Sequence, residues 1–169
     1  MNRGGYTCGI DIDLSEDVHP NFVRMGRRVK IRAGTIIFGS QDRELEIGDD
    51  VFIGFSCILQ GGAEKIRIGH RVTLAYGVKV HSDSGPNTSF LLQSAFPITA
   101  RPVVIEDDTW IGDNVVILPG VTIGHGSVIG AQTLVKSNIE PHTVVGGNPQ
   151  RVLRSLDDHK KQCHVCSLY

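Results

Sequence analysis

A six-residue rhythm runs through most of this chain and limits what it can fold into. From residue 105 the sequence reads IEDDTW, IGDNVV, ILPGVT, IGHGSV, IGAQTL and VKSNIE, so an aliphatic residue returns at every sixth position. The same spacing runs from Ile47 to Leu59, resumes after a slip from Ile68 to Val80, and already links Ile31 to Ile37. A period of six matches neither the 3.6-residue repeat of an α-helix nor the two-residue alternation of a long strand.

The period fits a chain that runs straight for a few residues, turns and repeats. Three such sides close a triangular coil, and stacked coils form a β-helix whose flat faces are parallel sheets. We expect the leading Ile or Val and the small fifth residue of each hexapeptide to point inward. Glycine and asparagine should supply the turns, where positive φ is tolerated by these residue types. A β-sandwich, the alternative all-β fold, would not keep one phase for so long.

One long interruption separates Val80 from Ile105. Its Gly and Pro residues exclude continuous coil strand, so we expect an excursion over residues 82–101 with a short helical turn near residues 88–96. The apolar side chains of this excursion should pack on the outer wall of the prism or on a neighbouring subunit; they are Phe90, Leu91, Leu92 and Phe96.

The two ends depart from the repeat. Residues 1–17 are expected to form an N-terminal cap segment, residues 18–150 the β-helix domain, and residues 151–169 a C-terminal helix and loose tail. The helix is predicted over residues 152–161, with Leu153 and Leu156 as its buried stripe. Capping matters because an uncovered terminal coil is an exposed sheet edge.

Composition narrows the possible partners and the compartment. The formal net charge of -1 offers no basic excess to neutralise phosphates, which argues against nucleic-acid binding. No apolar run approaches the length of a membrane span, and the first residues lack the apolar segment of a signal peptide. The four cysteines do not suggest a disulfide framework. We therefore expect a cytoplasmic protein with no membrane partner.

The repeat resembles that of the hexapeptide-repeat acyltransferases over residues 18–154, most of the chain. The resemblance implies an all-β fold, a left-handed parallel β-helix with a projecting loop and a short C-terminal helix. Handedness comes from the resemblance alone, since the general preference for right-handed crossovers predicts the opposite. It also implies acetyl-CoA as the acyl donor, and a homotrimer whose sites lie between subunits. Outward apolar residues agree with such an assembly; they are Phe52, Phe55 and Tyr76.

His81 is the candidate catalytic residue. It ends a repeat and begins the excursion, and histidine is suited to remove a proton near neutral pH. In the family it resembles, a histidine just before the projecting loop is the general base, and we carry that role to His81. Asp83 is a candidate to orient the ring or to form a turn. Ser82, Asp83 and Asn87 are the candidate acceptor-binding residues.

Several later residues resemble the coenzyme-binding part of the family. The string GGNPQR is similar to the family's closing signature, with glutamine where alanine is usual. Trp110 matches a tryptophan beside the thioester, and arginines suit the coenzyme phosphates by geometry. The candidate coenzyme-binding residues are Trp110, Lys136, Gly147, Asn148, Pro149, Arg151 and Arg154.

The resemblance implies an acetyltransferase that modifies a hydroxyl of a sugar or polysaccharide precursor by direct attack. N-acetylation of an amino sugar or an antibiotic-like amine shares the fold and the base, so it stays open. A non-catalytic β-helix scaffold is a third hypothesis. A zinc site like that of the gamma-type carbonic anhydrases needs, after His81, two histidines five residues apart on a later stretch of the β-helix, and no such pair occurs in residues 82–150. No metal is therefore expected.

Overall fold

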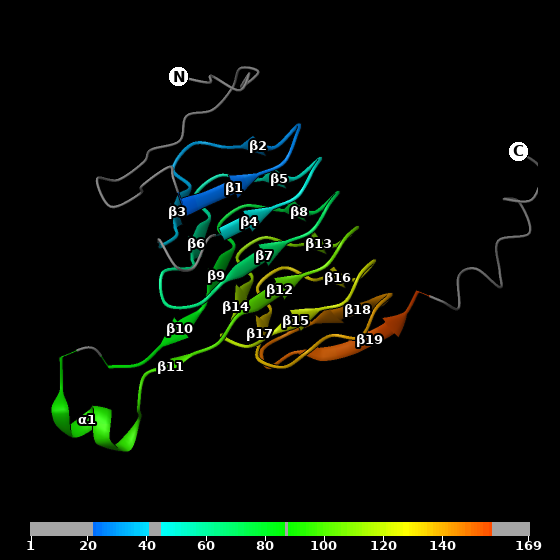
Figure 1. Ribbon diagram of the computed structural model, residues 1–169. Coiled ribbons are helices and arrows are strands. Elements are labelled where there is room, and N and C mark those ends of the chain that lie inside the picture. Colours follow the sequence, from blue (N-terminus) through cyan, green and yellow to red (C-terminus); the bar gives the residue numbers. More distant parts are fainter. Residues whose placement is uncertain (1–21, 41–44, 87, 157–169) are drawn as a thin grey trace, which may run out of the picture.

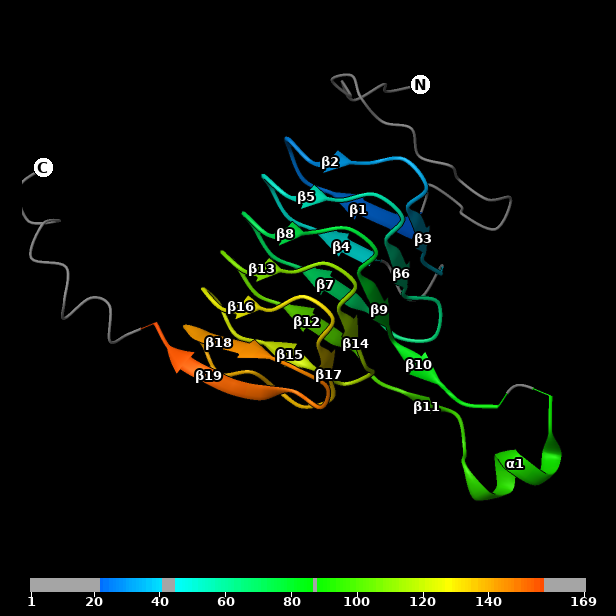
Figure 2. The same ribbon diagram turned by 180° about the vertical axis from the view of Figure 1, so that it is seen from behind.

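The chain forms a left-handed parallel β-helix, a three-walled prism with one long loop projecting from it (Figure 1). The computed structural model describes residues 22–40, 45–86 and 88–156. Strands such as β1 (Val23–Met25) cross the near side from left to right, and the chain returns along the far side while it descends toward the C-terminus. This sense of winding is the left-handed one that the resemblance predicted. The same stack is seen from behind in Figure 2.

Each wall of the prism is a sheet whose β-helix strands are parallel. The first face contains β1, β4 (Leu45–Ile47), β7 (Ile66–Ile68), β12 (Val103–Ile105) and β15 (Thr122–Ile123). The second face contains β2 (Lys30–Ile31), β5 (Phe52–Ile53), β8 (Thr73–Leu74), β13 (Trp110–Ile111), β16 (Val128–Ile129) and β18 (Thr143–Gly146), with β19 (Arg151–Ser155) antiparallel at its edge. The third face contains β3 (Ile36–Phe38), β6 (Ile58–Gln60), β9 (Lys79–His81), β14 (Val116–Ile117) and β17 (Leu134–Val135).

The core is built from the leading residue of each hexapeptide, as the repeat predicts. Ile68 pairs in register with Ile105, and Ile105 pairs with Ile123, so one column of isoleucines runs down the inside of the first face. These three side chains are at most 1% exposed. The fifth positions also point inward, and the polar ones among them, such as Thr109, bond to backbone carbonyls. Burial of branched aliphatic side chains in register is the main stabilising contribution of such a stack.

Glycine and asparagine supply some of the turns, as predicted, at residues such as Gly126 and Asn114, but the second-position glycines have a different cause. Positive φ falls at the fourth position of the hexapeptide, at residues such as Asp50, Arg71 and Gly77. Second-position glycines are needed instead because the next coil approaches closely: a Cβ on Gly48 would lie 2.6 Å from the carbonyl oxygen of Gly69. Their role is therefore to let neighbouring coils approach, and the left-handed turn belongs to the corner residue two positions later.

The excursion lies where the sequence predicts it. It leaves β9, forms the antiparallel pair β10 (Asp83–Ser84) and β11 (Thr99–Ala100), and carries α1 (Phe90–Ala95) at its tip (Figure 1). Ser89 caps the helix by accepting the amide of Leu92. None of the helix residues is buried, and Phe90 is 89% exposed. Packing of these side chains on the outer wall of their own prism is thus contradicted.

The predicted C-terminal helix is wrong over its described part. Residues 151–155 form β19, which pairs antiparallel with β18 and covers the edge of the second face. Leu153, expected in a buried stripe, is 64% exposed. A strand forms here because the last coil presents unpaired backbone groups that a returning strand satisfies. Residues 157–169 and the predicted N-terminal cap lie outside the described residues. Within the described part of the chain, no helix is long and apolar enough to cross a membrane.

Candidate active site

His81 ends β9 at the point where the chain leaves the prism. On this strand Val80 is buried, whereas Lys79 and His81 are half-buried, so the imidazole faces outward from the third face. Its Nδ1 lies 3.0 Å from Oε1 of Gln60, which occupies the same register position one coil earlier. This contact leaves Nε2 as the ring nitrogen without a described partner among the residues that the structure covers.

Asp83 reaches His81 through an intermediate side chain. Nε2 of Gln60 donates to Oδ1 of Asp83 at 3.0 Å, so Gln60 lies between the carboxylate and the imidazole. Asp83 belongs to β10, the first strand of the projecting loop, and Gln60 belongs to β6 of the prism. The three side chains therefore join the loop to the coil at the place where His81 stands.

Ser82 anchors the base of the loop. Its side chain is fully buried, and Oγ accepts a hydrogen bond from the amide of Glu64 at 3.1 Å. Its carbonyl accepts from the amide of Arg101, which closes the two ends of the excursion onto each other. This burial argues against the expected contact with an acceptor. Asn87, the remaining acceptor candidate, lies outside the described residues.

Lys136 shares a column with His81. His81 follows Val80 and Lys136 follows Val135; these two leading residues both pair with Ile117 of β14, which lies between them. Since neighbouring strands are ~4.8 Å apart, Lys136 lies roughly 10 Å along the prism axis from His81. Lys136 is exposed, so the column carries an imidazole and a cationic side chain on one outward edge.

The closing motif forms the turn between β18 and β19. Gly147 takes a φ of 98°, and the Asn148–Pro149 peptide bond is cis. The side chain of Gln150 accepts the amide of Lys136 at 2.7 Å and donates to the carbonyl oxygen of Ser137. The glutamine that departs from the family's usual alanine thus ties the motif to the end of the last third-face strand. Arg151 follows directly and is exposed.

Trp110 stands on a different wall from His81. It faces outward from β13 in the second face and is 56% exposed. Arg154, on β19, extends the same sheet at its C-terminal edge. One chain therefore brings together His81, Gln60 and Asp83, places Lys136 two coils further along the same face, and holds Trp110 on another face.

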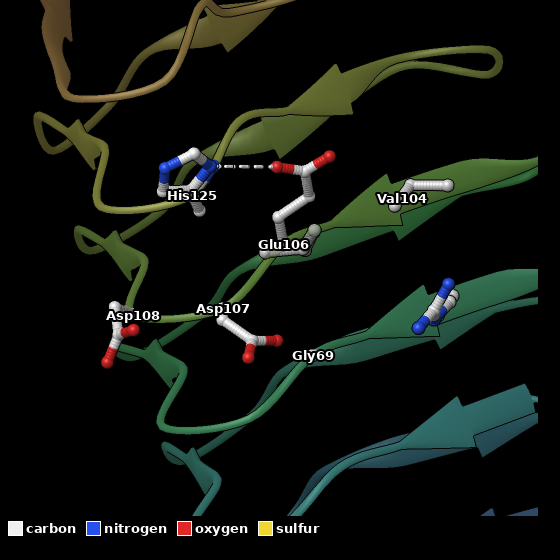
Figure 3. Close-up of a pocket in the computed structure, with 8 residues that line it drawn as sticks. Gly69, Val104, Glu106, Asp107, Asp108 and His125 are labelled. Atoms are coloured by element: carbon white, nitrogen blue, oxygen red, sulfur yellow. Dashed lines mark hydrogen bonds and ion pairs between the residues drawn. The ribbon is translucent and has the colours of Figure 1, made fainter.

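A shallow pocket of about 430 Å³ opens at the corner between the first and second faces (Figure 3). Three of the titratable side chains that line it already have partners: the ring of His125 faces the Glu106 carboxylate at 3.4 Å, and Asp107 accepts the amide of His70. Because these pairs hold consecutive corners together, we do not assign catalysis to this pocket. His70 and His125 are exposed at these corners.

The described residues offer little support for other chemistries. No group of three His, Cys, Asp or Glu side chains within them is arranged to hold a metal ion. Cys57 is buried inside a corner, and its thiol lies 3.1 Å from the carbonyl oxygen of Ala75. Burial raises the pKa of the Cys57 thiol, which disfavours the nucleophilic thiolate.

Gln60 was not among the residues expected from the sequence. The signal for it was present, because Leu59 and Val80 are both leading positions, and the residues after them must be neighbours on adjacent coils. Finding it required the register across the bulge at residues 61–65, which the repeat alone leaves ambiguous.

Comparison with known proteins places this chain and its fold among the hexapeptide-repeat acyltransferases. The family model described as bacterial transferase hexapeptide (six repeats) matches residues 102–137, and that described as hexapeptide repeat of succinyl-transferase matches residues 45–81. A chloramphenicol acetyltransferase from Escherichia coli is 36% identical over 115 residues, which are 63% of this chain and 51% of that protein. The chain thus spans about half the length of the curated relatives it matches, or less.

Solved structures that are similar to this chain are also hexapeptide-repeat acetyltransferases and a galactoside acetyltransferase. A hexapeptide-repeat-containing acetyltransferase from Vibrio cholerae is 34% identical, with a TM-score of 0.70 over 79% of this chain and 73% of that one. The same protein has been solved in complex with acetyl coenzyme A, with a TM-score of 0.53, 33% identity, and coverage of 80% and 61%. A galactoside acetyltransferase in complex with coenzyme A is 30% identical, with a TM-score of 0.54 over 82% of this chain and 57% of that one.

Proposed function

The chain belongs to the hexapeptide-repeat acyltransferases, and from that premise we propose that it transfers an acetyl group from acetyl-CoA to a hydroxyl of a sugar or saccharide precursor. The observation that carries the proposal is the outward imidazole of His81 at the foot of the projecting loop, with its Nδ1 held by Gln60. A scaffold protein would have no use for a histidine fixed in this way. Among the relatives, the galactoside acetyltransferase is named for a sugar acceptor.

In the proposed reaction, His81 acts as the general base. Nε2 takes the proton of the acceptor hydroxyl while the acceptor oxygen attacks the thioester carbonyl carbon. The C–S bond then breaks, the acetyl group stays on the acceptor, and the proton passes from His81 to the departing sulfur. The buried thiol of Cys57 is poorly suited to form an acyl-enzyme, which favours direct transfer.

The donor would lie along the prism, from His81 toward the C-terminal coils. The amide groups and side chains of outward positions suit a long flexible arm, and the exposed Lys136 and Arg151 suit its anionic end. Gly147, Asn148 and Pro149 are proposed to shape that end of the site through the turn they form. Arg154 is proposed to extend the cationic surface along β19.

We propose that the complete site lies between chains of a homotrimer. His81 and Trp110 occupy different faces of one prism, so a single groove can use both only if two chains contribute. The exposed apolar side chains of α1 supply a second reason, since a soluble chain rarely leaves such a cluster in water. A threefold ring is a closed symmetry that repeats the same groove.

A panel of acceptors tests the proposed reaction. The purified protein is incubated with acetyl-CoA and with galactosides, other sugars, amino sugars and chloramphenicol, and products are identified by mass spectrometry. We expect a product heavier by one acetyl group with at least one sugar hydroxyl, and an equal release of free thiol. Acetylation confined to amines would replace the proposal with N-acetylation. Absence of any acetylated product, together with absence of acetyl-CoA binding, would favour the scaffold.

A further inference from the structure

We propose that Gln60 and Asp83 are positioning residues that fix the tautomer of His81, with Asp83 setting the direction of a hydrogen-bond chain that Gln60 passes on. This inference rests on the proposed function, since it concerns how His81 is prepared as a base. Neither residue touches the reacting atoms in this scheme. Both act through the imidazole, over bonds of 3.0 Å from Asp83 to Gln60 and 3.0 Å from Gln60 to His81.

The direction of these hydrogen bonds follows from which groups can donate a proton and which can only accept one. An ionised carboxylate only accepts, so Asp83 requires the amide nitrogen of Gln60 to face it. The carbonyl end of the same amide then faces His81, and a carbonyl oxygen also only accepts. Nδ1 of His81 must therefore carry the proton. In the neutral ring this leaves Nε2 unprotonated, as a general base requires.

The hydrogen bonds that run from Asp83 through Gln60 are the main polar influence on the His81 imidazole. The strands that flank β9 in the sheet, β6 and β14, carry no titratable side chain. Lys79 lies on β9 itself and Asp83 on β10, and two further charged residues reach the neighbouring Ser82 through their amides: Glu64, which bonds its Oγ, and Arg101, which bonds its carbonyl oxygen. Gln60 is neutral, so it transmits a preference for one tautomer without placing a second charge beside the base.

An isosteric change at Asp83 separates this role from a merely structural one. Asp83→Asn keeps the shape and the number of hydrogen bonds, but an amide can either donate or accept. The hydrogen bonds that link residue 83, Gln60 and His81 can then run in either donor-to-acceptor direction. Nitrogen-15 NMR of histidine-labelled protein should find the Nδ1–H tautomer alone in the wild type and a mixture of tautomers in the variant. The kcat should fall in proportion to the population that loses the Nδ1–H form, while the acetyl-CoA Kd stays unchanged.

Two further variants complete the test. Gln60→Met keeps the length of the side chain and removes both polar ends, so kcat should fall roughly 10-fold or more, up to the ~10²–10⁴-fold contribution of the general base itself. Asp113→Asn is the matched control, because Asp113 accepts the Tyr76 amide at another corner and asparagine can do the same. Its kcat and histidine spectrum should match the wild type.

The outcomes distinguish this inference from the proposed function. If His81→Ala abolishes transfer but Asp83→Asn and Gln60→Met leave the tautomer and kcat unchanged, the positioning chain is wrong and the base stands. An Nε2–H tautomer in the wild-type spectrum overturns the inference directly. If His81→Ala transfers acetyl at the wild-type rate, the base itself is wrong, and the inference falls with it.

Discussion

At the scale of single residues, the second-position glycines set how closely the coils can stack. All but Gly130 lie where atoms of the next coil already occupy the space that a methyl group would fill. A Cβ on Gly112 would lie 2.7 Å from the backbone nitrogen of Ala131 and 2.9 Å from the carbonyl oxygen of Ile129. Backbone atoms in a paired sheet cannot move aside as a flexible side chain can.

Gly112→Ala should therefore destabilise the protein by about 1–3 kcal/mol or more, the range for added volume in a well-packed site. Gly62→Ala is the matched control, since a Cβ there meets nothing within 4 Å, and its effect should stay within about 0.5 kcal/mol. Urea unfolding followed by circular dichroism measures both. Equal stabilities for the two variants would contradict the close-approach explanation.

At the scale of elements, the corner between the first and second faces carries a ladder of alternating charge. Arg28 pairs with Asp50, which lies one coil further along the prism. Arg71 lies on the coil after Asp50 and pairs with Asp108, again one coil further along. Arg71 binds Asp108 through two bonds, of 2.6 and 2.8 Å. The hydrogen bonds and charge of Arg71 hold the pKa of Asp108 below its usual range, and Arg28 does the same to the pKa of Asp50.

The ladder should make part of the stability depend on pH. Because the pKa of Asp108 is lower in the folded chain, its pair contributes fully above the ordinary Asp pKa of about 3.9 and is lost as the pH falls through the folded-state value. Asp108→Asn removes the stability that comes from the ionised Asp108, and it has a second effect on stability that does not vary with pH. The Tm difference between wild type and variant should include both effects at pH 6. Near pH 3 it should change toward the pH-independent effect alone. A difference that stays constant over this range would mean that the pair adds no stability.

The sequence predicted the prism well because its signal is repeated and local. Each leading residue in the range 105–135 has the same environment one coil away, so one pattern specified many contacts. It predicted poorly where the repeat ends. Leu153 and Leu156 are three residues apart, as on one face of a helix, yet residues 151–155 form β19, because an unpaired sheet edge was available and local periodicity does not report tertiary partners.

In the candidate site too, the features that the repeat specifies were predicted and those that depend on tertiary contacts were not. The place of His81 was predicted, because it ends a repeat and begins the excursion. The burial of Ser82 and the bridging by Gln60 were not, since both depend on how the loop closes against the preceding coil. Trp110 and the Phe90 side chain are exposed in the single chain, so the repeat specifies no contact for them, and in the proposed trimer a neighbouring chain would supply it.

At the scale of the whole molecule, a site shared between chains should allow two inactive variants to restore each other. One variant is His81→Ala. The other is Trp110→Asp, which places a negative charge on the outward surface of the second face without touching the core. In a mixed trimer, one groove can combine the intact His81 of one chain with the intact Trp110 of another.

Co-expression with two affinity tags isolates the mixed assemblies, and light scattering gives their size. We expect trimers in which acetyl transfer reappears although each parent is inactive. Mixed trimers as inactive as both parents would contradict a shared site, and so would full activity of Trp110→Asp alone.

The most direct test of the account is the rate of acetyl transfer by His81→Ala. The side chain is half-buried and outward, so its removal should leave the prism and the acetyl-CoA Kd intact. With the acceptor identified from the panel, kcat should fall by about 10²–10⁴-fold, the contribution of a general base. A variant that binds acetyl-CoA and turns over at the wild-type rate would contradict the account.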